Sequence, residues 1–199
     1  MAAADPEARA YTRTIWAIVV GIFLLGAAET AFALHLGNRL LLKDALEWSY
    51  DVAIYAAAAI SFGRGDRIER LSALGIAAVL AIAGLQGSYE VARAVFIPPV
   101  IEPLTVGVSA ALIIVEGLAV AAALWRFRAS PNPLIEASWL SARNDAISAA
   151  LFALIIAAAR LAPMRWPQMA VDAFTAFLAF QAAWTIARDA RAQKPDAPV

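Results

Sequence analysis

The sequence has no cysteine, and only one of its 199 residues is a histidine. The absence of cysteine excludes disulfide bonds and thiolate metal sites. Without cysteine, the sequence does not indicate whether the protein lies in an oxidising or a reducing compartment. His35 alone is weak support for a metal, because imidazole-based sites normally use several histidines. The 16 basic and 16 acidic side chains cancel, so the charge balance gives no sign of nucleic acid as a partner.

Charged residues are also scarce. They form 16% of the chain, against roughly 25% in soluble domains, and hydrophobic residues form 62%. A helix of ~20 apolar residues crosses a hydrocarbon core ~30 Å thick, so the chain has room for about six spans. No phosphate-binding loop, nucleophile elbow or histidine cluster is present, and we therefore do not expect an enzyme.

Six hydrophobic stretches predict six helices, and turn residues mark the boundaries between them. Every proline after Pro6 falls at a boundary or in the tail, which suits a residue that lacks a backbone N–H. We expect an all-α membrane protein: a polar segment over 1–12, a bundle of six transmembrane helices over 13–190 and a polar tail over 191–199. The predicted helices are 15–36, 41–62, 68–97, 104–127, 134–161 and 168–190, with the last turn at 163–167.

Basic residues are distributed unevenly between the two ends of these helices. Lys and Arg near span ends tend to stay in the cytoplasm, so the asymmetry orients the bundle. It predicts that both termini are cytoplasmic and that the number of spans is even. With the N-terminus inside, the inner side holds Arg9, Arg13, Arg64, Arg67, Arg70, Arg126, Arg128, Arg188, Arg191 and Lys194, and the outer side holds Arg39, Lys43, Arg93, Arg160 and Arg165.

A cleaved signal peptide is the alternative interpretation of the first helix. Arg9 and Arg13 precede an apolar run, and Ala-Phe-Ala at 31–33 resembles a cleavage site. However, the run is longer than the ~7–15 apolar residues of a signal peptide, and Glu29 lies within it. We therefore expect a retained span.

Acidic residues inside the predicted spans are the candidates for function. Ionisable groups in hydrocarbon cost at least ~2.5 kcal/mol each, so they normally face a bundle interior or water. Glu47 and Asp51 are four residues apart and therefore share one helix face. Two like charges there require a proton or a cation, and a divalent ion is one solution. The alternative for Asp44 and Glu47 is that they only cap the helix start, where acids suit the helix dipole.

The helix predicted over 134–161 repeats this spacing with Ser141 and Asp145, and Arg143 and Asn144 lie beside them. In one interpretation Asp145 is a metal ligand. In the other it forms a salt bridge with Arg143, or with an arginine of another helix, and serves packing only. Four further carboxylates stand alone in their helices and are expected to form hydrogen bonds between helices: Glu29, Glu90, Glu116 and Asp172.

Several segments together resemble the membrane domain of the cation diffusion facilitator family, whose members exchange divalent metal ions for protons. Lys-Asp-Ala-Leu-Glu-Trp-Ser-Tyr-Asp at 43–51 resembles the family's first metal-binding segment, and Asn-Asp-Ala-Ile-Ser at 144–148 resembles its second. Arg-Ile-Glu-Arg-Leu at 67–71 is similar to the opening of the family's third helix. Residues 89–98 look like the end of that helix, and 166–172 like the start of the sixth.

The resemblance implies a tetrahedral site formed by Glu47, Asp51, Ser141 and Asp145. The metal ion would be the cargo, and no organic cofactor is implied. The family usually has His or Asp at the position of Ser141, whose hydroxyl is a poor ligand. Oxygen ligands without imidazole shift the preference among Zn²⁺, Fe²⁺ and Mn²⁺ toward the harder ions. The resemblance further implies a homodimer in the lipid bilayer of a bacterial inner membrane.

Two departures from the family pattern support a second interpretation. Ser141 weakens the metal site, and the chain ends soon after 190, where the family has a cytoplasmic C-terminal domain. The loop at 63–67 also lacks the family's histidine-rich part. A chain that keeps the helical scaffold without a working site would serve as a structural or assembly subunit of a larger membrane complex.

Overall fold

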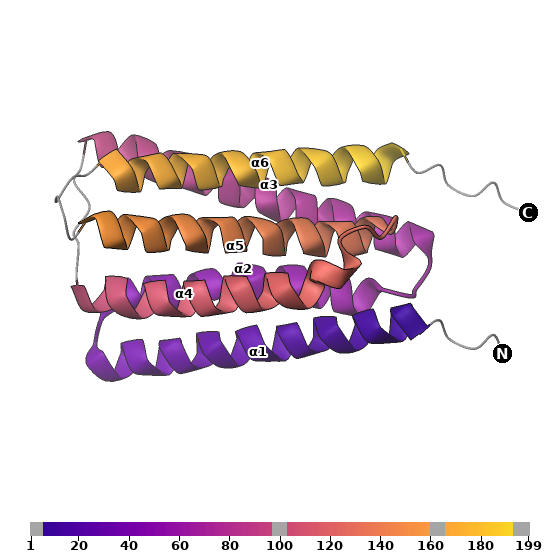
Figure 1. Ribbon diagram of the computed structural model, residues 1–199, viewed down its shortest axis with the longest axis horizontal. Coiled ribbons are helices and arrows are strands. Elements are labelled where there is room, and N and C mark those ends of the chain that lie inside the picture. Colours follow the sequence, from indigo (N-terminus) through magenta and orange to yellow (C-terminus); the bar gives the residue numbers. More distant parts are fainter. Residues whose placement is uncertain (1–5, 97–102, 160–165, 193–199) are drawn as a thin grey trace, which may run out of the picture.

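The computed structural model describes residues 6–96, 103–159 and 166–192 (Figure 1). Over these ranges the fold is all-α, with six helices and no strand, as the sequence predicts. A single 3₁₀ turn, η1, follows the fourth helix. The elements are α1 (Pro6–Leu36), α2 (Arg39–Ser61), α3 (Asp66–Phe96), α4 (Pro103–Leu124), η1 (Trp125–Phe127), α5 (Pro133–Ala159) and α6 (Trp166–Ala192).

The first helix begins earlier than the hydrophobic pattern predicts. It starts at Pro6, so most of the predicted polar segment is helical. Proline suits this position because the first N–H of a helix has no partner within it, and Glu7 in the first turn complements the helix dipole. At the other end of the chain, Trp166 and Pro167 begin α6 rather than completing a turn. The rest of that predicted turn, with Pro98 and Pro99, lies outside the described residues.

The connection between α1 and α2 shows why the chain reverses there. Gly37 has a φ of 64°, a left-handed conformation that glycine adopts without steric cost. The backbone N–H of Asn38 donates to the carbonyl of Ala33 at 3.0 Å, which closes the end of α1. The Asn38 side chain then accepts from the backbone N–H of Leu41 at 2.9 Å. One Gly-Asn pair therefore ends one helix and caps the next.

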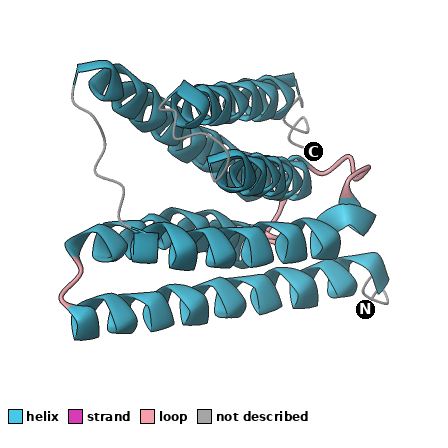
Figure 2. Cartoon of the chain, turned by 60° about the vertical axis from the view of Figure 1, so that its left-hand side comes forward, coloured by secondary structure: helices cyan, strands magenta, loops and turns pink. Residues whose placement is uncertain are grey.

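The six helices form two groups of three (Figure 2). One group contains α1, α2 and α4, and the other contains α3, α5 and α6. Within the groups the closest pairs are α1 with α2 and α3 with α6, whereas the main contact between the groups is that of α4 with α5. The start of α1 and the end of α6 lie at the same end of the bundle (Figure 1). We refer to the boundary between the two groups as the seam.

Two of the helices, α1 and α3, are long and apolar enough to cross a membrane. Their most apolar stretches have mean hydropathies of 2.1 and 1.8, and only 28% and 33% of the residues in these stretches are buried. Large apolar side chains face outward on several helices, including Phe23 on α1, Leu85 on α3 and Trp184 on α6. An apolar outer surface of this kind is typical of contact with lipid.

Glu69, near the start of α3, is buried and joins two loops at the end of the bundle where α1 begins. Its Oε1 accepts from the backbone N–H of Gly63, at 2.7 Å, in the loop between α2 and α3. Its Oε2 accepts from the side-chain amide of Asn132, before α5. The amide oxygen of Asn132 accepts in turn from the backbone N–H groups of Leu134 and Ile135, which caps α5.

Tyr11 joins several elements at the same end of the bundle. Its side chain is fully buried, and its hydroxyl lies 2.9 Å from Oγ of Ser138 on α5. The ring meets Phe62 and Phe127 edge to face, with centroid distances of 4.6 and 5.3 Å. Because edge-to-face pairs add to the energy of burial, this residue ties α1 to α5, to the end of α2 and to η1.

Replacing Tyr11 separates the contribution of the ring from that of the hydroxyl. We expect Tyr11→Ala to lower the free energy of unfolding by about 3–5 kcal/mol, because it opens a cavity among buried rings. Tyr11→Phe loses only the hydrogen bond and should cost about 1 kcal/mol. Reversible unfolding in detergent micelles measures both values.

Trp16→Ala is the matched control, since Trp16 is an exposed aromatic residue on the same helix. It should change the free energy of unfolding by less than about 0.5 kcal/mol. An equal loss in the two alanine variants would contradict the anchoring role of Tyr11.

Candidate functional site

The candidate site lies on the seam, where α2, α4 and α5 meet. It contains Asp51 and Tyr55 from α2, Glu116 from α4, and Ser141 and Asp145 from α5. The pairs on α2 and α5 are each four residues apart, so each pair shares one helix face. Glu116, Tyr55 and Ser141 are buried, and Asp51 and Asp145 are partly buried.

Tyr55 links the two halves of the molecule at this site. Its side chain is fully buried, and its hydroxyl donates to Oδ2 of Asp145 across the seam at 3.4 Å. Ser141 lies beside Tyr55, and over the described residues its buried Oγ meets no partner with full hydrogen-bond geometry. Oε1 of Glu116 is likewise buried without a hydrogen-bond partner. Unsatisfied buried oxygens are rare in folded proteins, and two of them occur in this one site.

The three carboxylates at the site act on one another electrostatically. The charges of Asp51 and Glu116 both act on Asp145, and the charge of Asp51 acts on Glu116. All three also act on the hydroxyl of Tyr55. Among the described residues, no arginine or lysine contributes to the electrostatic environment of Asp145 or Glu116. Like charges in a shared interior repel, so protons or a cation must neutralise them.

Gly117 allows α4 to approach α5 closely at this position. A Cβ on Gly117 would lie 3.0 Å from the backbone oxygen of Asp145 and 3.3 Å from the backbone nitrogen of Ala146. A side chain here would require the backbone of α5 to shift by a few tenths of an ångström, because the atoms that it meets belong to the backbone and cannot turn aside. The close approach brings the neighbouring residue, Glu116, to the carboxylate of Asp145.

The structure brings together three of the four residues predicted as metal ligands. Asp51, Ser141 and Asp145 converge on Tyr55, whereas the side chain of Glu47, like that of Asp44, lies outside the described residues. Over the described residues, no three His, Cys, Asp or Glu side chains form a group that could hold a metal ion. The tetrahedral site implied by the family resemblance therefore stays a prediction.

The alternative role for Asp145, a salt bridge with Arg143, is wrong. The Arg143 guanidinium donates to the amide oxygen of Asn144 at 3.0 Å and to that of Gln181, on α6, at 2.7 Å. The amide nitrogen of Asn144 donates to the backbone carbonyl of Leu178. These residues join α5 to α6, on the side of α5 away from the carboxylates.

Glu116 and Tyr55 are the two site residues that the sequence analysis did not assign to the site. We expected Glu116 to form a hydrogen bond between helices, but its Oε1 has no such partner. The same expectation is confirmed for Glu29, whose Oε2 accepts from the indole N–H of Trp48 at 2.5 Å between α1 and α2. Glu90 pairs with Arg93 on its own helix at 3.6 Å, and its expected bond between helices stays a prediction. The Glu116-Gly117 dipeptide was the available signal, since glycine in a span marks a close helix contact.

No protein-family model and no curated protein matches this chain. The resemblance to the cation diffusion facilitators therefore rests on the residues of the chain itself.

The close contact at Gly117 can be tested by adding one methyl group. We expect Gly117→Ala to lower the free energy of unfolding by about 1–3 kcal/mol, because the backbone of α5 must move away. Gly75→Ala is the matched control, since a Cβ at Gly75 meets nothing within 4 Å. It should be neutral or stabilising by up to about 1 kcal/mol. If both variants unfold like the unaltered protein, the packing at the seam is looser than described.

Proposed function

We propose that the chain is a six-span membrane protein that exchanges a divalent metal cation for protons across a bacterial inner membrane. The observation that carries the proposal is that Asp51, Glu116 and Asp145, on three helices that face one another at the seam, act on one another electrostatically. The cation is the cargo, and the carboxylate oxygens are its ligands.

Helix lengths support six spans. The shortest of the six helices has 22 residues, and about 20 suffice to cross the hydrocarbon core. The start of α1 and the end of α6 share one end of the bundle, as an even number of crossings requires (Figure 1). Arg9, Arg64 and Arg128 belong to this end, which is therefore the cytoplasmic one by the charge rule.

The chemistry of the site suits a hard cation. Asp51, Glu116 and Asp145 offer only oxygen ligands, and the unpartnered Oε1 of Glu116 and Oγ of Ser141 add two free acceptors. Oxygen ligands favour Mn²⁺ over Zn²⁺. Since these side chains do not form a metal-holding group in the described conformation, loading requires the two groups of helices to close along the seam.

Protons compete with the cation for the same oxygens. A carboxylate must release its proton to become a ligand, so loading of one species expels the other. The carboxylates interact and would titrate as one coupled cluster, not as separate groups. Exchange follows if the two groups of helices rock against each other and expose the seam to either side in turn.

Neutral substitutions at the three carboxylates test the proposal. Asp51→Asn, Glu116→Gln and Asp145→Asn should each reduce proton flux driven by a Mn²⁺ gradient more than about tenfold, because each removes a charged ligand. The assay uses purified protein in liposomes that enclose a pH-sensitive dye. In the unaltered protein, Mn²⁺ loading should fall as the pH is lowered.

Glu90→Gln is the matched control, because Glu90 is a surface carboxylate on α3 paired with Arg93. It should retain the flux of the unaltered protein. Unaltered flux in Asp51→Asn or in Asp145→Asn would refute the carboxylate mechanism.

A structural subunit is the second candidate function, and it is favoured by the presence at position 141 of serine, whose hydroxyl is a poor metal ligand. Isothermal titration with Mn²⁺, Zn²⁺ and Fe²⁺ separates the two. A transporter should bind at least one ion in its unaltered form. No binding at millimolar metal in the unaltered protein, together with strong binding in Ser141→His, would support a scaffold that has lost its site.

A further inference from the structure

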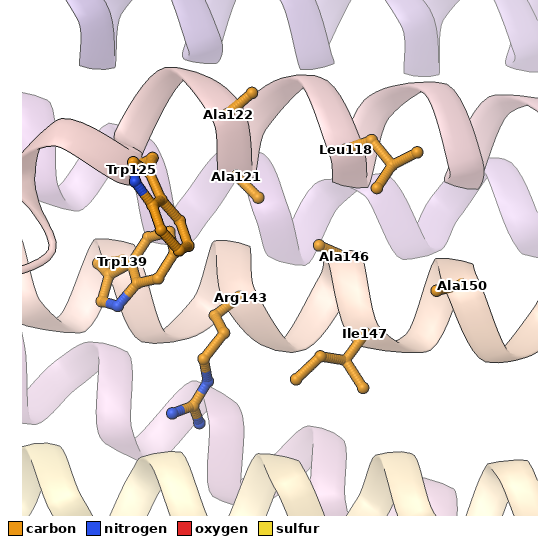
Figure 3. A pocket seen from close by; sticks show the side chains of 9 residues that line it. All are labelled: Leu118, Ala121, Ala122, Trp125, Trp139, Arg143, Ala146, Ile147 and Ala150. Atoms are coloured by element: carbon orange, nitrogen blue, oxygen red, sulfur yellow. The ribbon is translucent and has the colours of Figure 1, made fainter.

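A groove of about 700 Å³ lies on the outside of the bundle between α4 and α5 (Figure 3). It is away from the carboxylate site and runs along the two helices. Small and apolar side chains line most of it, including Leu118 and Ala122 on α4 and Ile147 and Ala150 on α5. Its size falls within the range of ligand pockets, ≈ 300–1,000 Å³.

Aromatic and basic side chains gather at one end of the groove. Trp125 and Trp139 meet edge to face with a centroid distance of 5.5 Å. The guanidinium of Arg128 lies over the ring of Trp125, 4.5 Å from its centroid. Arg143 lines the groove one turn beyond Trp139 (Figure 3). The tryptophan pair therefore has an arginine on each side.

Neither arginine is neutralised by an acidic side chain. Arg143 donates to the amide oxygens of Asn144 and Gln181, which are uncharged. Arg128 donates to the backbone carbonyl of Trp125. In the part of the chain that the structure describes, neither guanidinium has a carboxylate partner, so this end of the groove keeps a net positive charge.

We propose that the groove is a binding site for an anionic phospholipid, with the headgroup phosphate at the end that Trp125, Trp139 and Arg143 line and an acyl chain along Leu118, Ala122, Ile147 and Ala150. Arginine suits a phosphate because its planar guanidinium offers several donors in a fixed geometry. Tryptophans favour the depth of the headgroups, and the apolar part of the groove lies toward the middle of α4 and α5. A groove parallel to the helices has the direction of an acyl chain.

Charge complementarity decides between an anionic lipid and other occupants. A neutral lipid would leave both guanidinium groups without a counter-charge at the membrane surface. Arg143 lines the groove with its stem, and its guanidinium uses Nε and Nη2 to donate to Asn144 and Gln181, so Nη1 remains as a donor for a phosphate among the described contacts. The inference rests on the membrane placement in the proposed function but not on ion exchange, so failure of the flux assay leaves it intact.

Native mass spectrometry of the protein released from vesicles of equal parts phosphatidylglycerol and phosphatidylcholine tests the site. The unaltered protein should retain phosphatidylglycerol in excess. Arg143→Gln should reduce the ratio of the two retained lipids about fivefold, the factor expected when one basic residue is removed at an anionic surface. Arg143→Lys should keep most of the preference, because the charge remains.

Two further variants make the test specific. Arg93→Gln removes an arginine that is paired with Glu90 at the other end of the bundle, and it should leave the ratio unchanged. Ala122→Trp fills the groove from an exposed position and should lower retention of phosphatidylglycerol even if Arg143→Gln fails to fold. Equal retention of both lipids by the unaltered protein would overturn the proposal. The proposal would also be overturned if Ala122→Trp retained phosphatidylglycerol unchanged but lost a dimer. A second copy of the chain would then occupy the groove.

Discussion

Burial of like-charged side chains along one seam is the constraint on which the arrangement of the bundle depends. Asp51, Glu116 and Asp145 come from three helices and act on one another, while no basic side chain in the described part of the chain contributes to the surroundings of Glu116 or Asp145. Such an interior is unfavourable unless something neutralises it, and the cost is greatest where water is excluded. A stable scaffold could avoid the cost by using apolar residues at these positions. The retention of three carboxylates is therefore the strongest physical argument for a role in moving or binding positive charge.

Two different kinds of contact join α5 to the other group of helices along the seam. Gly117 holds α4 against the backbone of α5, whereas Tyr55 spans from α2 to α5 through one long hydrogen bond of 3.4 Å. A bond of this length is weak, so α2 is held to α5 less firmly than α4 is. Movement along the seam is therefore easiest where α2 faces Asp145. The close pairs within the groups, α1 with α2 and α3 with α6, would move together in such a movement.

The sequence predicted the six helices and their order because glycine, asparagine and proline mark the turns by local chemistry. The Gly37-Asn38 pair, for example, ends one helix and caps the next through contacts a few residues away. The four-residue spacings likewise predicted that Ser141 would lie beside Asp145 on one face. The role of Glu116 was not predictable in this way, because it depends on how close α4 comes to α5. The early start of α1 was missed because hydrophobicity does not report polar helical turns, and the contact of Tyr11 with Ser138 depends on packing between distant helices.

The bonds of Glu69 have a mechanical consequence for the molecule. Both chain segments that pass from one group of helices to the other through the described loops lie at the end where α1 begins, and Glu69 bridges them through Gly63 and Asn132. This carboxylate holds the two groups of helices together at that end. The two groups can separate at that end only if both hydrogen bonds of Glu69 break. Among the described residues, no comparable bridge is present at the opposite end. If the two groups of helices separate, they therefore open at the opposite end, and the end held by Glu69 acts as the hinge.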